Sequence, residues 1–319
     1  MSEPLILALP SKGRLKEQTE AWLADCGAPL KVLGGARGYS AEIEGFEEVE
    51  VRLASAADIA AGLAAGEVHL GVTGEDLLRE HGALEAAALR PLLPLGFGRA
   101  DLVVATPRSW IDVETMADLD DVAQLFLART GRRLRVATKY AVQTRAFFAR
   151  HGLADYRIAE SGGATEGAPA AGMAEAIVDI TTSGATLAAN GLKPLADGLI
   201  LRSEAQLAAS LVASWTDAQF DACARLIGVW EARARGRRMA CLSWPAAQDT
   251  AAEAAIGPFV AGQGDWRSHG ALIPRNRLFA AAAALSNAGV GPVAVTRAEQ
   301  VFEASSPAAL ELASALGRL

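Results

Sequence analysis

The sequence predicts an α/β protein that ends in a small α+β domain. Before Leu201, short apolar runs typical of buried strands alternate with segments of helical periodicity. After the cationic run Arg233–Arg238, the expected elements follow a βαββαβ-type order, which is typical of ferredoxin-like domains. A chain of 319 residues is long enough for two or three domains.

The chain begins with a strand, a polar turn and a helix. Leu5–Leu9 is an apolar run, Pro10–Gly13 predicts a turn, and Leu15, Trp22 and Leu23 follow with amphipathic helical spacing. We expect further strands at Val49–Leu53, Val68–Val72, Leu92–Phe97, Leu102–Thr106, Arg135–Thr138, Tyr156–Ala159, Ala176–Ile180 and Leu199–Leu201.

The expected helices are marked by capping residues and by small or amphipathic side chains. Ser55 or Asp58 can cap a helix that contains Ile59 and Leu63. Further helices are expected after Gly74, within Trp110–Arg133, through Phe147 to His151, from near Pro169, from Leu187 to Leu192, and from Leu201 through Trp230.

The C-terminal region is separated by Arg233–Arg238, a cationic, glycine-containing run without apolar periodicity that predicts a linker. Strands are expected after it at Met239–Trp244, near Phe259, at Gly270–Pro274 and at Val293–Thr296, with helices at Thr250–Ile256 and Leu278–Ala288. No catalytic group of residues is visible there, which favours regulation or oligomerisation.

Composition excludes several classes of protein. The formal net charge of -7 argues against a general nucleic-acid or membrane-surface binder, because those need clustered Lys and Arg. The three cysteines lack a CxxC pair, so neither zinc nor a disulfide framework is indicated. No stretch is apolar for long enough to span a membrane, and the N-terminus lacks the order of a secretory signal. We therefore expect a cytoplasmic protein.

The stretch Val178–Leu192 carries the strongest functional signal. An apolar run ends at Asp179. A turn rich in hydroxyl groups follows it, and a helix of small residues begins after the turn. Backbone amides at the start of a helix lack intrahelical partners and favour anions. The turn consists of Thr181, Thr182, Ser183, Gly184, Ala185 and Thr186. A phosphorylated ribose could form hydrogen bonds with the hydroxyls of this turn and with Asp179 at the same time. The alternative is that this sequence forms only an ordinary N-cap with a glycine turn.

Other polar turns follow expected strands. Lys12, Gly13 and Arg14 suit a phosphate or an adenine edge, and Lys139 and Tyr140 occupy an equivalent place after another strand. Thr73 and Gly74 form a third such turn, where the acids that follow are usually helix-dipole complements. Surface solvation is the alternative for each cation. The four histidines have no metal-ligand spacing, and no nucleophile motif occurs.

Several motifs in order resemble the ATP phosphoribosyltransferase family, whose members open histidine biosynthesis. They are LALPSKGRL, ADIAAGLAAGEVHLGVTGEDLL, RVATKY, GGATEGAPAAGMAEAIVDITTSGATLAANGL and LRSEAQL. The resemblance as a whole covers roughly Pro4 to Trp230. The chain departs from the family pattern at Ala141, where proline is usual, at Thr165, where valine is usual, and at Asp101, where a cation is usual. No substrate contact is therefore carried over to Asp101.

The resemblance implies two lobes of the type II periplasmic-binding-protein kind and a ferredoxin-like or ACT-like regulatory domain. The expected division is 1–106 with 193–234 for the first lobe, 107–192 for the second, and 235–319 for the C-terminal domain. The implied reaction joins ATP to phosphoribosyl pyrophosphate with release of pyrophosphate and uses Mg²⁺. The resemblance also implies inhibition by histidine and dimers that assemble into hexamers.

Residue roles follow from the matched motifs. The resemblance implies that the turn Thr182–Thr186 holds the 5-phosphate, that Asp179 and Glu166 engage the ribose hydroxyls, and that Arg14, Lys12 and Lys139 balance the phosphates. Gly13, Thr73, Gly74 and Tyr140 are the remaining expected contacts to ATP or phosphate. The competing hypotheses are a small-molecule-binding module on the same two-lobed fold and a catalytically impaired regulatory paralogue.

Overall fold

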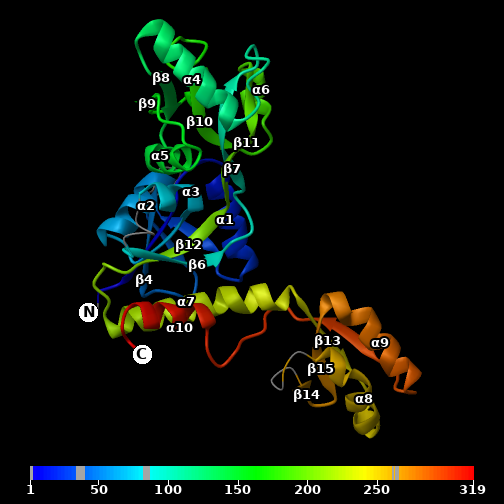
Figure 1. Ribbon diagram of the computed structural model, residues 1–319. Helices are drawn as coiled ribbons and strands as arrows, with labels where there is room; N and C mark the ends of the chain where they lie inside the picture. The colour runs from blue at the N-terminus through cyan, green and yellow to red at the C-terminus, as the bar shows by residue number, and fades with distance from the viewer. Residues whose placement is uncertain (1–2, 34–39, 82–86, 261, 263–265) are drawn as a thin grey trace.

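The computed structural model describes residues 3–33, 40–81, 87–260, 262 and 266–319. The strands in these ranges form three sheets. Figure 1 shows two lobes, one above the other, and a small third domain that stands apart at the far end of the long helix α7 (Asp217–Gly236). This arrangement confirms the predicted fold class: a two-lobed α/β region followed by a small α+β domain.

The first lobe is built on a seven-stranded sheet with the order β2-β3-β4-β1-β5-β12-β6. Its strands are β1 (Leu5–Pro10), β2 (Leu30–Leu33), β3 (Ser40–Ile43), β4 (Val49–Ala54), β5 (Leu70–Gly74), β6 (Leu89–Pro94) and β12 (Ala205–Ser210). Its helices are α1 (Gly13–Asp25), α2 (Ala56–Ala65), α3 (Glu75–Glu80) and most of α7. Strand β1 runs parallel to β4 and β5, so the turns after all three lie at one edge of the sheet.

Alternate residues of the central strands pack against different layers of helices. Leu7 and Leu9 of β1 belong to the same core cluster as Leu226 and Trp230 of α7, whereas Ala8 belongs to the cluster around Ile59 of α2. Buried side chains therefore cover both faces of the sheet. The predicted cap of α2 is confirmed, because the side chain of Ser55 accepts a hydrogen bond from the amide of Asp58.

The second lobe is built on a five-stranded sheet with the order β11-β7-β10-β8-β9. Its strands are β7 (Ala100–Pro107), β8 (Leu134–Thr138), β9 (Tyr156–Glu160), β10 (Ala176–Thr181) and β11 (Leu192–Ser203). Its helices are α4 (Met116–Thr130), α5 (Ala141–Arg150) and α6 (Ala185–Ala189). Strands β8, β9 and β10 are parallel, so the turns after β8 and β10 also share one edge.

The chain crosses between the lobes twice, before β7 and after β11. Antiparallel pairing of Ala100 with Ser203 holds the two crossing segments together, and Glu204 separates β11 from β12. The expected division assigned β7 and β11 to the first lobe. Their hydrogen bonds place them in the sheet of the second lobe, because β7 pairs with β10 from Asp101 to Ala105.

The C-terminal domain has a four-stranded sheet with the order β14-β15-β13-β16 and antiparallel pairing throughout. Its elements are β13 (Met239–Ser243), α8 (Asp249–Ile256), β14 (Trp266–Arg267), β15 (Gly270–Pro274), α9 (Leu278–Asn287) and β16 (Ala294–Arg297). Chain order and sheet order together give the ferredoxin-like arrangement that the sequence predicts. Leu242, Ile256, Ile273 and Leu285 form part of its core.

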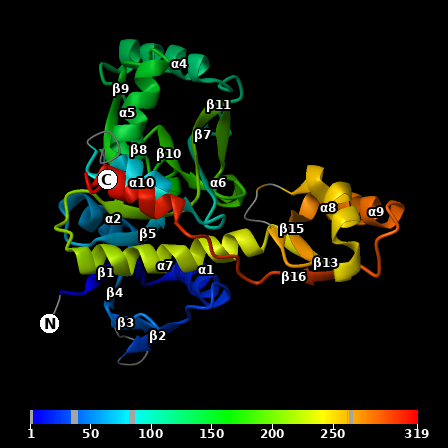
Figure 2. The same ribbon diagram turned by 90° about the horizontal axis from the view of Figure 1, so that it is seen from below.

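The last helix, α10 (Pro307–Ala315), returns to the first lobe instead of completing the C-terminal domain. Ala308 and Leu312 belong to the core cluster of the seven-stranded sheet. Figures 1 and 2 both show α10 beside the first part of α7, far from α8 and α9. The C-terminal domain is thus an insertion between α7 and α10, whereas the expected unit 235–319 placed α10 within it.

Some expected elements are wrong. Leu201–Ser210 does not start a helix, since it contains the end of β11 and all of the buried strand β12. Arg233–Arg238 is not a flexible linker, because α7 continues to Gly236 and both Arg233 and Arg237 pair with Asp25 of α1. Both errors come from tertiary partners that sequence periodicity does not report.

Three further expectations fail within the described ranges. The residues after Pro169 form turns, and Gly257–Phe259 is a short 3₁₀ helix where a strand was expected. Leu192 was expected in a helix, but α6 ends at Ala189 and Leu192 is the first residue of β11.

No helix among the described residues combines the length and apolarity needed to cross a membrane.

The packing of α10 predicts a strong effect of Leu312→Ala on stability. Leu312 is fully buried, so its truncation should leave a cavity and lower the free energy of unfolding by about 2–5 kcal/mol. Leu310, on the same helix, is 46% exposed, and Leu310→Ala should change that free energy by less than about 0.5 kcal/mol. Urea unfolding of both variants measures the difference, and equal losses would contradict the packing described for α10.

Candidate active site

The candidate residues lie where strands of the two lobes end. In the first lobe, β1 is followed by Lys12–Arg14, and β5 ends with Thr73 and Gly74. In the second lobe, β8 is followed by Lys139 and Tyr140, and the polar end of β10 begins at Asp179. Open α/β sheets bind ligands at the carboxyl ends of their parallel strands. The fold therefore gathers four separate stretches of sequence at sheet edges suited to a ligand.

The turn after β10 has a conformation that requires glycine at one position. Gly184 has a φ of 73°, in the left-handed region, and a side chain there would meet no atom within 4 Å. The requirement is therefore conformational and not steric. Thr182, Ser183, Ala185 and Thr186 are exposed, so their side chains line open space.

Some of the polar groups of this turn are already engaged within the protein. The Thr181 hydroxyl oxygen accepts a hydrogen bond from the Gly184 amide at 2.8 Å, and the Ser183 hydroxyl oxygen lies 3.4 Å from the Ala185 amide. The Thr182 hydroxyl donates to the carbonyl of Arg99 at 3.4 Å, a long contact. In the described part of the chain, no side chain accepts from the amides of Thr182, Ser183 or Thr186, so these remain suited to a phosphate.

Asp179 is a carboxylate at these strand ends whose pKa is raised above its ordinary value. Burial raises its pKa, against the hydrogen bond from the Ile180 amide and the charge of Lys139, which lower it. The carboxylates of Glu166 and Asp76 raise it further. These interactions bring Lys139, Glu166 and Asp179 into one electrostatic group. A half-buried carboxylate at a strand end is a common feature of functional sites.

Asp76 links the two lobes through its carboxylate. Its Oδ2 accepts a hydrogen bond at 2.7 Å from the hydroxyl of Tyr140, at the start of α5. Its Oδ1 accepts one at 2.7 Å from the hydroxyl of Ser203, the last residue of β11. The amide side chain of Gln143 donates to the Asp76 carbonyl at 2.8 Å. One buried residue of α3 therefore holds three groups that belong to elements of the second lobe.

Glu80 makes a second connection between the same two helices. Its carboxylate accepts hydrogen bonds from the amides of Val142 at 2.8 Å and Gln143 at 3.2 Å, both in the first turn of α5. A carboxylate at a helix N-terminus satisfies free amides and complements the helix dipole. Ala141, where the family usually has proline, is the first residue of that helix.

Sequence reasoning missed the part played by Asp76. Acids in the first turn of a helix usually complement the dipole, and Glu75 fits that interpretation, since it pairs with Arg79 on the surface. The signal that could have singled out Asp76 is Gly74. A side chain at Gly74 would lie 2.2 Å from Asp76 Oδ1, so the glycine leaves room for the carboxylate to fold back.

The hydroxyls of Thr73 and Tyr140 are used inside the protein. Both side chains are fully buried, and Thr73 donates to the carbonyl of Ala56 at 2.7 Å. Burial and the neighbouring Asp76 raise the pKa of Tyr140, which keeps its hydroxyl protonated as a donor. The structure thus differs from the expected direct ATP contacts at these two side chains. Lys12, Gly13, Arg14 and Lys139 are exposed and accessible to a ligand.

The donor set does not form a complete metal cage. Among the described residues, no group of three His, Cys, Asp or Glu side chains is arranged to hold a metal ion. Mg²⁺ is commonly bound by one or two carboxylates together with substrate phosphates and water. Asp179 and Glu166, which interact electrostatically, fit that mode of binding.

The raised pKa of Asp179 predicts that Asp179→Asn stabilises the protein at neutral pH. The folded protein binds this proton more tightly than the unfolded chain does, so wild-type stability falls as the pH rises above the ordinary value of 3.8. The variant does not lose stability in this way, because asparagine still accepts a hydrogen bond from the Ile180 amide but carries no charge.

Chemical unfolding at a series of pH values tests this expectation. The stability gain of Asp179→Asn should be largest at neutral pH and shrink as the pH falls toward 3.8. Asp112→Asn, at an exposed position, is the matched control and should show no such trend. A variant that is less stable than wild type at pH 7 would show that burial does not disfavour the Asp179 charge.

Comparisons with known proteins identify the family of the chain. A model of the ATP phosphoribosyltransferase family (HisG) matches residues 55–228, more than half of the chain. The chain is 63% identical over 316 residues to an ATP phosphoribosyltransferase of Caulobacter vibrioides, with 99% of each chain covered. It is 48% identical over 332 residues to an ATP phosphoribosyltransferase of Bradyrhizobium diazoefficiens, with both chains fully covered.

Among solved structures, the chain is similar to the ATP phosphoribosyl transferase (HisG:HisZ) complex from Thermotoga maritima. That match has a TM-score of 0.49 and 25% identity and covers 65% of this chain and 87% of the other. The family match and the full-length relatives carry the conclusion. The chain belongs to the ATP phosphoribosyltransferase family, the phosphoribosyl-transferring enzymes that catalyse the first step of histidine biosynthesis.

Proposed function

We propose that the chain joins ATP to phosphoribosyl pyrophosphate in the cleft between its lobes, with the turn Thr181–Thr186 around the phosphoribosyl group. The observation that supports this most is the half-buried Asp179, which lies directly before a turn of exposed hydroxyls and free amides. A ribose phosphate presents both hydroxyls and an anion, which are the kinds of group that the carboxylate and the turn can bind. In this proposal Asp179 and Glu166 accept from the ribose hydroxyls.

The reaction needs positioning and charge compensation more than acid–base chemistry. A bond forms between adenine N1 and ribose C1, while the bond from C1 to the pyrophosphate oxygen breaks and the pyrophosphate leaves with the electron pair. Both substrates are polyanions and repel each other, so cations must hold them together. Lys12, Arg14 and Lys139 are exposed at strand ends. Lys139 interacts electrostatically with Asp179, and none of the three forms a close ion pair with a described residue. We assign the phosphates to them.

Gly13, between Lys12 and Arg14, allows a ligand to approach the backbone closely. Gly13 has a φ of 70° at the start of α1, and no atom lies within 4 Å of the position a side chain would take. We assign the phosphate or adenine contact there to backbone amides. At Thr73, Gly74 and Tyr140, the proposal is limited to backbone contact and positioning, because the two hydroxyls are engaged within the protein.

Mg²⁺ is the proposed metal ion, bound mainly through the pyrophosphate of the substrate. It would neutralise charge on the leaving group, which is the chemistry a divalent cation supplies in phosphate transfer. Asp179 and Glu166 are the protein carboxylates placed to assist. Because the described residues form no complete cage, magnesium affinity should depend on the presence of phosphoribosyl pyrophosphate.

Histidine is the proposed inhibitor, and the proposed assembly is a dimer that forms hexamers. The ferredoxin-like domain supports both proposals, because it lies outside the catalytic lobes and joins them through α7 and through the segment before α10. The competing hypotheses of a binding module and an impaired paralogue are less favoured, since the full-length relatives are named as the enzyme and the strand-end residues are intact.

Thr186→Val tests the phosphoribosyl turn. Thr186 is exposed, and valine keeps its shape while removing the hydroxyl. Loss of a hydrogen bond to a charged phosphate should raise KM for phosphoribosyl pyrophosphate about tenfold or more, with KM for ATP nearly unchanged. Initial rates with Mg²⁺ and pyrophosphatase, followed by the absorbance of the adduct, give both constants.

The matched control is Thr130→Val, an exposed threonine at the end of α4 in the same lobe. It should leave both constants unchanged. An effect of Thr186→Val on ATP alone, or on neither substrate, would remove Thr186 from the phosphoribosyl site.

A further inference from the structure

Every described residue that lines one hollow of the second lobe is an arginine. This arginine hollow has a volume of about 380 Å³, within the range of small-molecule sites. Its lining consists of Arg132 and Arg133, which precede β8, of Arg135 in β8 and of Arg157 in β9. Because β8, β9 and β10 are parallel, the hollow lies at the edge of the sheet where these strands begin, opposite the edge that carries the candidate active site.

A cluster of cations stands out in this chain, which has 30 Lys and Arg against 37 Asp and Glu. In the pairing of β8 with β9, Arg135 lies directly opposite Arg157. Like charges in opposite positions on neighbouring strands repel each other and destabilise a sheet. An anion between the two guanidinium groups would remove that repulsion.

Two of the four guanidinium groups are held in place by contacts within the protein. Arg135 donates to both carboxylate oxygens of Glu175 and to the carbonyl of Gly172, at 2.8 to 3.3 Å. Arg132 donates to the same carboxylate at 3.1 Å and lies over the ring of Phe126, 4.5 Å from the ring centroid. A guanidinium has five N–H donors, so both groups keep donors for a ligand, and their order lowers the entropy cost of binding.

The other two guanidinium groups are exposed and lack a close partner. Nε of Arg133 lies 4.0 Å from the carboxylate of Asp155, and the side chain of Arg157 forms no hydrogen bond or ion pair with the described part of the chain. Burial would raise the pKa of Glu175, but hydrogen bonds from the two fixed arginines lower it to about 2, so this carboxylate is ionised. Four guanidinium groups and two carboxylates leave two positive charges uncompensated.

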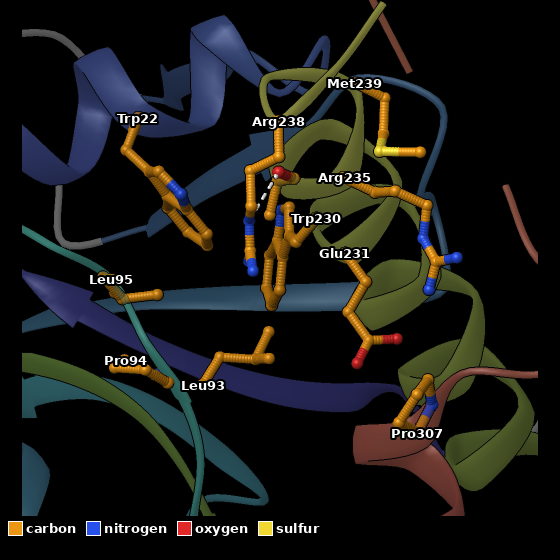
Figure 3. A pocket seen from close by; sticks show the side chains of 11 residues that line it. Trp22, Leu93, Pro94, Leu95, Trp230, Glu231, Arg235, Arg238, Met239 and Pro307 are labelled. Carbon is orange, nitrogen blue, oxygen red and sulfur yellow. Dashed lines mark hydrogen bonds between the residues drawn. The ribbon is translucent and has the colours of Figure 1, made fainter. Parts of the chain in front are cut away.

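The arginine hollow differs in kind from the hollow between the first lobe and the C-terminal domain. Figure 3 shows Trp22, Trp230 and apolar side chains around the latter, with Glu231 among its charged groups. Arg235 of that lining is paired with Glu303. Of the described residues, no aromatic, aliphatic or acidic one lines the arginine hollow. Its ligand is therefore selected by charge and hydrogen bonding, without apolar packing.

We propose that the arginine hollow binds a phosphate group in its doubly charged form, from inorganic phosphate, pyrophosphate or a sugar phosphate. Two negative charges match the two uncompensated positive charges. Phosphate oxygens also match the paired donors of guanidinium groups, which bind them in bidentate fashion. A carboxylate would leave one positive charge uncompensated. This site is separate from the roles proposed for the residues at the opposite edge of the sheet, so its test is independent of them.

Equilibrium dialysis of the full-length protein at low ionic strength against radiolabelled phosphate, pyrophosphate or ribose 5-phosphate tests the site. At least one of these anions should bind in the hollow with a Kd below about 1 mM, and the one that binds most tightly identifies the source of the phosphate group. Added sodium chloride should weaken this binding, because salt screens exposed charges.

Arg157→Gln and Arg133→Gln locate the binding. Each removes one exposed guanidinium and should weaken it about tenfold or more, because hydrogen bonds between ionised groups are strong. Arg277→Gln, at an exposed position of the C-terminal domain, removes the same charge and should change nothing. Thr186→Val, at the candidate active site, should leave intact the binding that depends on these arginines.

Circular dichroism and thermal unfolding confirm that the variants fold. Absence of binding by all three anions, or binding that both Arg157→Gln and Arg133→Gln leave unchanged, overturns the proposal.

Discussion

The arrangement of the candidate active site depends on one buried carboxylate, that of Asp76. It receives the hydroxyls of Tyr140 and Ser203, so a residue of the first lobe fixes the start of α5 and the end of β11. Glu80 adds a second contact by capping α5. A buried charge is costly unless its lone pairs are satisfied, and here each carboxylate oxygen has a short hydrogen bond. The ends of β5 and β8 are brought together as a result.

The candidate active site has rigid parts that are buried and paired, and other parts that are exposed to solvent, an arrangement that suits substrate binding. Thr73 and Tyr140 are fully paired inside the protein and keep the turns in place. Lys12, Arg14 and Lys139 keep exposed cations, and the turn after β10 keeps exposed hydroxyls. Burial of Asp179 disfavours its charged form and raises its pKa. Removing a carboxylate from water lowers the stability of the fold. Its presence at this position is therefore best explained by a function that needs the charge.

Much of this could be predicted from the sequence because the turns have local causes. Where a strand ends in Gly, Thr or Lys before an amphipathic run, these residues themselves determine the turn and the start of the helix. This local pattern predicted the segments around Gly13, Gly74, Lys139 and Gly184. What failed depended on distant partners. Strand β12 contains Gln206 and several alanines and was mistaken for a helix, although neighbours on both sides bury it. The cationic end of α7 was mistaken for a linker because Asp25, which pairs with it, lies more than two hundred residues earlier.

The central claim is that the turn after β10 receives the phosphoribosyl group. A crystal structure with phosphoribosyl pyrophosphate bound is its most direct test. The account predicts the 5-phosphate against the amides and hydroxyls of Thr182–Thr186, the ribose hydroxyls within hydrogen-bonding distance of Asp179, and an intact bond between Tyr140 and Asp76. A sugar phosphate bound elsewhere, with this turn free of ligand, would contradict it.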